Sequence, residues 1–526
     1  MQKFRSLLLF ALAIFTFASL GLAALSPDSA PIVKLSLGSL EGVTFPGGTA
    51  AFVGVPYATP PEGELRWKPP EPARKWTGVR KATAFGPVCP QLPQGWLPYI
   101  AGQEDCLYLN IWTSRVSANA KLPVIVFFHG GSNTAGYSQF TPLGPPFVRL
   151  GVVMVTANYR LGPFGFFAYP ALTAESPHHS SGNYGLLDQI QALRWVRDNI
   201  SQFGGDPARV TIMGQSAGAV DVCMLMASPL AKDLFRGAIL QSGECQSGLN
   251  EDIRQPIHYN GIEDTGEAVG ERLASDLGVA NGPEALQKLR SISVDTILKA
   301  WSNDSRVHFE AIVDGWVVPE QPAKIFAEQK QSPVPILIGS NADEATVFNL
   351  GVKTLDQYKK YLQEDTGKFS DQEFAAYPAT SDSEVPAQYL QLQNDSFAYA
   401  AYSMAVNLTR SGQSAYLYNF TFAETGKRAN LGAHHGLELN FLADSYPPDW
   451  QHSEADRRLG EYIRRYWAQF AKTGDPNYKG SPAWPVFNPQ ADQLLELGRT
   501  VRVGAVSPRV HTLADVMNKV LRDWGD

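Results

Sequence analysis

Short runs of continuous apolar residues, each followed by turn residues, are the feature that most constrains this chain. Helical patterns at residues 186–200 and 265–277 lie between some of these runs. Strands that are apolar along their whole length are buried on both faces, and their alternation with helices is typical of a parallel sheet covered by helices. The predicted strands are residues 122–128, 152–157, 210–213, 238–240, 335–338 and 415–420.

The composition supports one large folded unit. Of 526 residues, 44% are hydrophobic and 18% charged, which is enough apolar material for a large core. The net charge of −7 is scattered without a block of one sign, so we do not expect nucleic acid as a partner. No repeat or linker divides the sequence, and we predict a single domain over residues 24–526.

The N-terminus has the pattern of a secretory signal peptide. Lys3 and Arg5 precede an apolar stretch, residues 7–20, that is too short to span a bilayer, and small residues follow around Ala23. No stop-transfer pattern follows. We therefore predict a signal peptide over residues 1–23 and a secreted, extracellular protein without a stable membrane anchor.

Four cysteines suit an oxidising compartment. Cys89 and Cys106 would close a short loop, and we favour a disulfide between them. For Cys223 and Cys245, a disulfide and a pair of buried thiols remain equal alternatives, because the sequence does not give their Cα separation.

Asn-x-Ser/Thr triplets mark candidate glycosylation sites. We discount Asn199, which lies in what reads as a packed helix end. The expected acceptors are Asn303, Asn394, Asn407 and Asn419.

A G-x-S-x-G motif carries the chemistry. The apolar run 210–213 leads into Gly214-Gln215-Ser216-Ala217-Gly218, and a helix-compatible stretch, residues 219–227, follows. This order of strand, tight turn and helix is the context of a nucleophile elbow, in which flanking glycines leave room for the turn and the serine projects from the sheet edge. We therefore predict that Ser216 is a nucleophile.

A second glycine-rich turn could supply hydrogen-bond donors for an oxyanion. The run 122–128 ends in His129-Gly130-Gly131-Ser132, whose amides can face the same edge. We predict that the amides of Gly131, Ser132 and Ala217 form the oxyanion hole, with Gly130 supporting the turn.

A serine nucleophile also needs a histidine base and an orienting carboxylate. The run 335–338 exits into a loop with Asp343 and Glu344, and the run 415–420 is followed by a loop with His434 and His435. Both loops follow strand ends and should reach the rim that holds the serine. Spacing alone does not decide between Asp343 and Glu344, or between His434 and His435.

With these residues, the chain resembles the type-B carboxylesterase/lipase family, which also contains the cholinesterases. The similarity covers nearly the whole mature chain and is of the kind found in a secreted microbial or fungal carboxylesterase. The matching segments are FVGVPYA at 52–58, EDCLYLN at 104–110, NYRLG at 158–162, GNYGLLDQ at 182–189, FGGDP at 203–207 and TGDPN at 473–477.

The resemblance implies the α/β-hydrolase fold with cap insertions, and it assigns roles. The family's acid is the glutamate of an Asp-Glu pair and its base is the histidine of His-Gly-x-Glu, which here are Glu344 and His435. It also implies the Cys89–Cys106 disulfide. The chain departs from the family at Ser132-Asn133 and Ala345, which puts the lining of the oxyanion hole in question.

We therefore predict a serine hydrolase that cleaves small carboxylic esters through an acyl-enzyme on Ser216. No cofactor is expected, and no metal, because the histidines lack ligand spacing. A lipase acting on longer acylglycerols and an inactive cholinesterase-like adhesion protein remain alternatives, and a monomer and a dimer are both open. Trp96 occupies the offset of the choline-stacking tryptophan of cholinesterases, but the shorter Cys89–Cys106 loop argues against choline specificity.

Overall fold

The protein is represented by a computed structural model that describes residues 30–45, 48–94, 100–257, 264–348, 350–426, 428–447, 450 and 452–525. The predicted signal peptide, residues 1–23, and Trp96 lie outside these ranges. None of the described helices is both long and apolar enough to cross a membrane.

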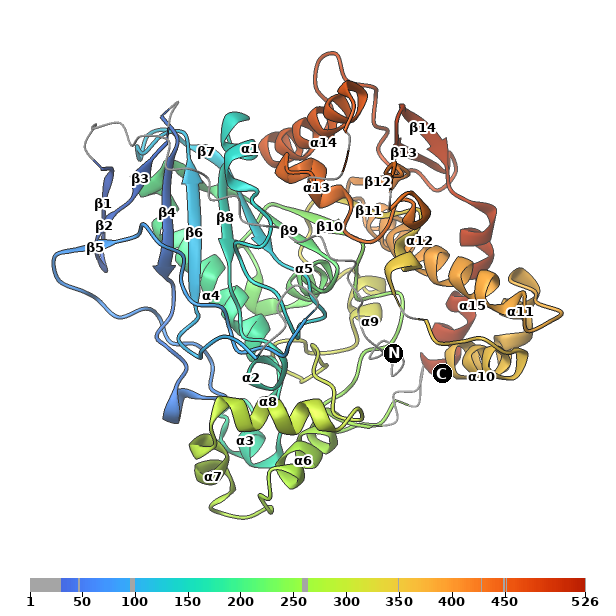
Figure 1. The fold of residues 1–526 in the computed structure, drawn as a ribbon, viewed down its shortest axis with the longest axis horizontal. Helices are drawn as coiled ribbons and strands as arrows, with labels where there is room; N and C mark the ends of the chain where they lie inside the picture. The colour runs from blue at the N-terminus through green and yellow to red at the C-terminus, as the bar shows by residue number, and fades with distance from the viewer. Residues whose placement is uncertain are drawn as a thin grey trace.

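A large mixed sheet dominates the described residues (Figure 1). Its order is β14-β13-β12-β11-β10-β9-β7-β8-β6-β4-β3, and every neighbouring pair from β8 to β13 is parallel. The strands are β3 (Val43–Thr44), β4 (Ala50–Pro56), β6 (Tyr108–Thr113), β7 (Leu122–Phe128), β8 (Val153–Ala157), β9 (Gly205–Gln215), β10 (Gly237–Gln241), β11 (Ile336–Asn341), β12 (Ala415–Phe420), β13 (Gln493–Leu497) and β14 (Val501–Ala505). A small second sheet contains β1 (Ile32–Leu35), β2 (Gly38–Glu41) and β5 (Val79–Lys81).

Both faces of the sheet are buried, as the continuous apolar runs predict. Along β7, Val124, Val126 and Phe128 belong to one apolar cluster, whereas Ile125 and Phe127 belong to another. Successive side chains of a strand point to opposite faces, so the two clusters lie on the two sides of the sheet. The predicted mostly parallel sheet with helices on both faces is confirmed.

Different helices cover the two faces. The first cluster includes side chains of α4, α5 and α12, and the second includes side chains of α1, α13 and α14. The helices are α1 (Gly144–Arg149), α2 (Gly162–Gly165), α3 (Pro170–Glu175), α4 (Tyr184–Asn199), α5 (Ala217–Ala227), α6 (Gly266–Asp276), α7 (Ala285–Ser291), α8 (Val294–Asn303), α9 (Pro322–Ala327), α10 (Leu355–Thr366), α11 (Ser370–Ala376), α12 (Val385–Arg410), α13 (Glu438–Ala443), α14 (Glu454–Thr473) and α15 (Pro508–Gly525).

Two groups of helices are inserted between neighbouring parallel strands. Helices α6 to α9 connect β10 to β11, and α10 to α12 connect β11 to β12. Figure 1 shows α6, α7 and α8 gathered at one end of the molecule and α10, α11 and α15 at another. Because the carboxyl ends of parallel strands meet at one edge, the loops after β7, β9, β11 and β12 are brought together there.

Candidate active site

Ser216 stands at a sharp turn between β9 and α5. Its backbone has φ 57° and ψ −128°, and its N–H donates to Gln241 O on the neighbouring strand at 2.8 Å. A non-glycine residue at positive φ is uncommon and costs free energy unless its surroundings hold it. A Cβ at Gly214 would lie 2.0 Å from Gly218 O, and one at Gly218 would lie 2.2 Å from Phe128 O. The two glycines of the motif are therefore required by close backbone contacts.

The structure brings Glu344 and His435 together. Glu344 Oε2 lies 2.5 Å from His435 Nδ1, and the other oxygen of this carboxylate accepts from Asn341 N at 2.7 Å. Glu344 follows β11 and is fully buried, and His435 lies in the loop between β12 and α13. This carboxylate fixes the imidazole so that Nε2 faces away from it.

The neighbouring candidates have other partners. Asp343 accepts from Ala433 N at 2.8 Å, and His434 Nε2 lies 3.2 Å from a carboxylate oxygen of Glu424. Of the four candidates left open by spacing, Glu344 and His435 are the carboxylate and imidazole that contact each other among the described residues.

The free nitrogen of His435 faces Gln215, the residue before the serine. Gln215 Nε2 lies 3.1 Å from His435 Nε2, and among the described hydrogen bonds none joins Ser216 Oγ to the imidazole. Ser216 and His435 nevertheless line the same cavity. Hydrogen bonds of catalytic groups are often long or misaligned without substrate and tighten when it binds.

Two buried carboxylates act on the imidazole. Burial alone would lower the pKa of His435, but the charge of Glu344 and its hydrogen bond, with a smaller effect of Glu438, raise the pKa above its ordinary value. Glu438 accepts from Gln241 Nε2 at 2.9 Å and from Asn341 Nδ2 at 2.7 Å. Burial, followed by the charge of Glu344, raises the pKa of Glu438.

The loop after β7 presents free amides to the same cavity. Gly131 has φ 117° and Ser132 φ 55°, and both line the cavity with Ala217 at the first position of α5. Within the described residues, the N–H groups of Gly131, Ser132 and Ala217 have no protein acceptor. Unpaired amides at a helix N-terminus and a tight turn are the donors that an oxyanion requires. A Cβ at Gly130 would meet Gln215 O at 2.6 Å, so this glycine allows the loop to approach the serine turn.

A buried polar network under this loop escaped the sequence analysis. Asn133 Nδ2 donates to Asp221 Oδ1 at 2.9 Å, and Gln189 Nε2 donates to the other oxygen at 2.6 Å. Tyr159 donates its hydroxyl hydrogen to His129 O at 2.6 Å. Burial raises the pKa of Asp221 to about 7. Asp221 of α5 thus holds the side chain of Asn133 in place. Two residues together could have revealed this contact in the sequence: the asparagine after Ser132 and the aspartate five positions after Ser216.

The cavity itself has a volume of about 500 Å³. Aromatic rings flank the imidazole, with Phe348 and Phe397 centred 5.1 and 5.4 Å from the His435 ring. The inserted helices contribute Tyr361, Phe397 and Tyr399, and α15 contributes Leu513 and Met517. A largely apolar cavity with a small number of polar groups suits a small organic molecule.

Both cysteine pairs form disulfides. Cys89–Cys106 joins Cα atoms 5.0 Å apart, and Cys223–Cys245 joins Cα atoms 5.6 Å apart, which is within the range that a disulfide spans. The alternative of two buried thiols at Cys223 and Cys245 is therefore wrong.

The expected glycosylation acceptors differ in accessibility. Asn303 is exposed at the end of α8. Asn394 is buried in α12 and accepts from Ala345 N at 2.7 Å, so its amide has no room for a glycan. Asn407 is half-buried in α12 and hydrogen-bonded to Gln246, and Asn419 is half-buried in β12. Burial makes Asn394 the least accessible of the four predicted acceptors in the folded chain.

No group of three His, Cys, Asp or Glu side chains within the described ranges could hold a metal ion. The residues of the site are instead those of acid–base and nucleophilic chemistry.

Comparison with known proteins gives a consistent result. The sequence model of the carboxylesterase family matches residues 29–513. The chain is 35% identical over 508 residues to the fumonisin B1 esterase of Sphingopyxis macrogoltabida, covering 92% of this chain and 90% of that protein. It is 34% identical over 495 residues to the pyrethroid hydrolase Ces2a of Mus musculus, covering 87% and 85%.

Solved structures agree with the sequence comparisons. A PNB esterase superposes with a TM-score of 0.79 at 30% identity, covering 93% of this chain and 100% of that one. A carboxylesterase of Geobacillus stearothermophilus superposes with a TM-score of 0.76 at 31% identity, covering 92% and 99%. The predicted α/β-hydrolase fold is confirmed.

Proposed function

The chain belongs to the carboxylesterase family and is a carboxylic ester hydrolase, and we propose that it cleaves small esters through an acyl-enzyme formed on Ser216. The observation that carries this proposal is the shared cavity of Ser216 and His435, together with the 2.5 Å contact between His435 Nδ1 and Glu344. The alternatives of a lipase and an inactive adhesion protein gain no support from the relatives, which are named as esterases and as a pyrethroid hydrolase.

The first half of the reaction forms the acyl-enzyme. Ser216 Oγ attacks the ester carbonyl while His435 Nε2 takes its proton, and Glu344 stabilises the imidazolium that results. The amides of Gly131, Ser132 and Ala217 donate to the oxyanion. His435 then returns the proton to the alcohol oxygen as the carbon–oxygen bond breaks.

The second half releases the acid. A water molecule gives its proton to His435 and attacks the acyl carbon, and Ser216 leaves with the proton restored. Before the first step the imidazole Nε2 must turn from the Gln215 amide toward Ser216 Oγ. Residues 215 and 216 are adjacent and line one cavity with His435, which supports such a movement.

We also propose that the enzyme is exported after removal of residues 1–23. The two disulfides support this, because such bonds persist in oxidising compartments. Asn303 is the acceptor we expect to carry a glycan in a eukaryotic host.

Replacement of the nucleophile tests the mechanism. Ser216→Ala should lower kcat for a 4-nitrophenyl ester by at least about 10³-fold, because the bond-forming oxygen is lost. A fluorophosphonate should add its mass to the wild-type peptide that contains residue 216 and to no peptide of the variant. Ser302→Ala, which replaces an exposed serine of α8, is the matched control and should keep full turnover and labelling. Full turnover by a folded Ser216→Ala enzyme would overturn the proposal.

A further inference from the structure

The cavity beside Ser216 has an unbalanced charge. Its described lining includes three carboxylates, Glu244, Glu310 and Asp365, whereas His435 is the one basic residue in this lining and neither Lys nor Arg occurs in it. A cavity with carboxylates and low-dielectric walls concentrates cations and repels anions. A carboxylate of this lining that forms no hydrogen bond or ion pair within the protein is available to a cationic ligand.

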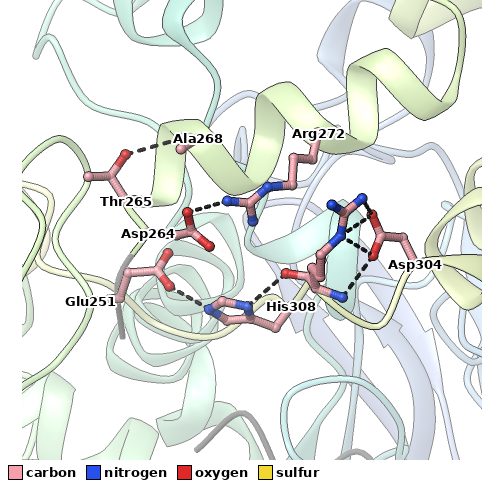
Figure 2. A network of polar contacts seen from close by, with 8 residues as sticks. Glu251, Asp264, Thr265, Ala268, Arg272, Asp304 and His308 are labelled. Atoms are coloured by element: carbon pink, nitrogen blue, oxygen red, sulfur yellow. Dashed lines mark hydrogen bonds and ion pairs between the residues drawn. The ribbon is translucent and has the colours of Figure 1, made fainter. Parts of the chain in front are cut away.

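Glu310 lies close enough to His308 for its charge to act on that imidazole, and His308 belongs to a group of basic residues that are already paired (Figure 2). His308 Nε2 lies 2.5 Å from the buried carboxylate of Glu251, and Arg272 is bonded to Asp264. Arg306 donates to Asp304 at 2.7 Å. Figure 2 shows the Glu251–His308 and Asp264–Arg272 pairs side by side, with Asp304 in the same group. Each of these basic residues is therefore paired with a carboxylate other than Glu310.

Glu310 shares His308 with Glu251. Burial would lower the pKa of His308, but Glu251 and, to a smaller extent, the charge of Glu310 outweigh burial and raise this pKa, and the hydrogen-bonded partner is Glu251. The side chain of Glu310 is half-buried, and among the described residues no hydrogen bond or ion pair ends on its carboxylate. A partly desolvated carboxylate without a partner is costly, and a ligand that brings a positive charge would offset that cost.

Asp365 stands on α10 at another part of the cavity. It faces the buried Glu373, and each lies close enough to affect the ionisation of the other. Burial, and after it the charge of Asp365, raises the pKa of Glu373, while burial raises the pKa of Asp365. Asp365 is the member of this pair that lines the cavity, and an ammonium group placed beside it would favour its ionised form.

Aromatic rings accompany Asp365. Tyr361 and Tyr399 line the cavity with it, and its charge contributes, after burial, to the raised pKa values of both phenols. Tyrosine faces attract organic cations, which adds to the effect of a nearby carboxylate.

Glu244 has a different role. Its carboxylate accepts from Gln246 N at 2.6 Å and from Ser247 N at 3.1 Å, so it closes its own turn. We therefore leave it out of the assignment.

We propose that this cavity selects carboxylic esters that carry a protonated amine, and that Glu310 and Asp365 are the residues that receive the ammonium group. The inference rests on the proposed function, since it concerns esters that reach Ser216. It predicts that charge, at constant size, decides between substrates.

A matched series of esters tests the inference. We would measure kcat/KM at pH 7.5 and low salt for 4-nitrophenyl heptanoate, 6-aminohexanoate and hydrogen adipate, which are neutral, cationic and anionic chains of similar length. A second arm uses 3-methylbutyl and 2-(dimethylamino)ethyl acetates, which place the charge on the alcohol. The cationic member of at least one arm should exceed its neutral partner by about tenfold or more, and the anionic ester should be the poorest substrate.

Variants assign the effect to residues. Glu310→Gln and Asp365→Asn should each reduce the cationic preference by about threefold to tenfold while neutral esters change less than about twofold, and Glu310→Lys should reverse the preference. Glu454→Gln removes the same charge from an exposed side chain outside the cavity lining and is the matched control. Melting temperatures would identify a variant that fails to fold, and Glu310 and Asp365 provide independent tests.

The outcomes separate this inference from the proposed mechanism. Equal kcat/KM for cationic and neutral esters, or a preference unchanged in both Gln and Asn variants, would overturn the charge selection while hydrolysis at Ser216 stands. Loss of the preference at raised salt in the wild type, in parallel with its loss in the variants, would support it.

Discussion

Two walls of the active-site cavity are built in different ways. The reaction wall, which consists of residues 131–133, 215–217 and 435, is positioned by backbone contacts and glycines after strand ends. The helical wall, which consists of Tyr361, Asp365, Gln393, Phe397, Tyr399, Leu513 and Met517, is made of side chains from α10, α12 and α15. The contrast separates the two tasks of the enzyme. Changes in the reaction wall should slow the hydrolysis of every ester, whereas changes in the helical wall should alter which ester is preferred.

The largest expected effect is on the acid that supports the reaction wall. Glu344→Gln keeps the shape of the side chain but removes the charge that stabilises the imidazolium, so kcat/KM should fall about 10³- to 10⁴-fold for all esters alike. Steady-state kinetics on short and long esters would measure it.

Asp343→Asn is the control for that change. Among the described residues its carboxylate accepts from Ala433 N alone, and an amide oxygen can do the same. Greater loss in Asp343→Asn than in Glu344→Gln would move the role of the acid to Asp343.

A methyl group on the oxyanion loop should come next in size. In Gly131→Ala the new Cβ would lie 2.1 Å from Ala135 O at a backbone φ of 117°, so the loop must shift and its donors move. We expect kcat to fall about 10²- to 10³-fold, with KM changed much less.

Gly480→Ala shares the positive φ, at 89°, but meets open space, and it should retain activity. If both variants lost activity equally, general backbone strain and not donor placement would be responsible.

The pH profile probes the reaction wall without mutation. In the proposed mechanism His435 must be neutral to accept the proton from Ser216. Its pKa is raised above the ordinary 6.5 because the effect of Glu344 outweighs that of burial. As the pH falls through that raised pKa, kcat/KM should decline about tenfold per pH unit.

Glu438→Gln should shift the midpoint toward lower pH, because the charge of Glu438 also raises the pKa of His435. A midpoint that stayed in place, or moved upward, would mean that Glu438 does not act on the imidazole.

The smallest effect on turnover should come from the helical wall. Phe397→Leu removes a ring 5.4 Å from the imidazole ring but leaves every donor and base in place. For an acetate ester, kcat/KM should change less than about threefold, whereas the ratio between octanoate and acetate should change more, since apolar contact area with the chain is lost.

Phe85→Leu, at a 47% exposed ring outside the cavity lining, should leave both values unchanged. An equal loss for acetate and octanoate in Phe397→Leu would assign the ring to the reaction wall.

The same contrast between the two walls explains which parts of the fold and the site could be predicted from the sequence. The predicted strands 122–128 and 415–420 coincide with β7 and β12, because long apolar runs between turns leave one interpretation. The serine turn was predictable for a similar reason, since glycines at positions 214 and 218 are needed for local contacts. Features that depend on short-range contacts were therefore predictable from short stretches of sequence.

The antiparallel strands before β7 left weaker signals. In β4 the register shifts between Phe52 and Val55, and Gly54 N donates to the side chain of Asn110 in β6 at 2.9 Å. A bulge breaks the two-residue period, and a buried asparagine interrupts the apolar run. Neither β4 nor β6 was predicted, because the bulge and the buried asparagine become favourable only when the two strands pair with each other.

The helical wall was not predictable at all from motifs. Asp365 and Tyr399 of this wall come from the β11–β12 insertion, Glu310 across the cavity comes from the β10–β11 insertion, and the three line one cavity only after the sheet has formed. Their types would suit any exposed loop or helix, so nothing in the sequence separates them from surface residues.

The Cys223–Cys245 bond joins the helix that begins directly after the nucleophile to a residue that lines the substrate cavity. Closing a loop of this length stabilises a protein by about 3 kcal/mol in the chain-entropy treatment. Thiol reductants in a purification buffer would remove that restraint beside the serine turn, so an enzyme prepared in dithiothreitol and one prepared in air should not be treated as the same catalyst.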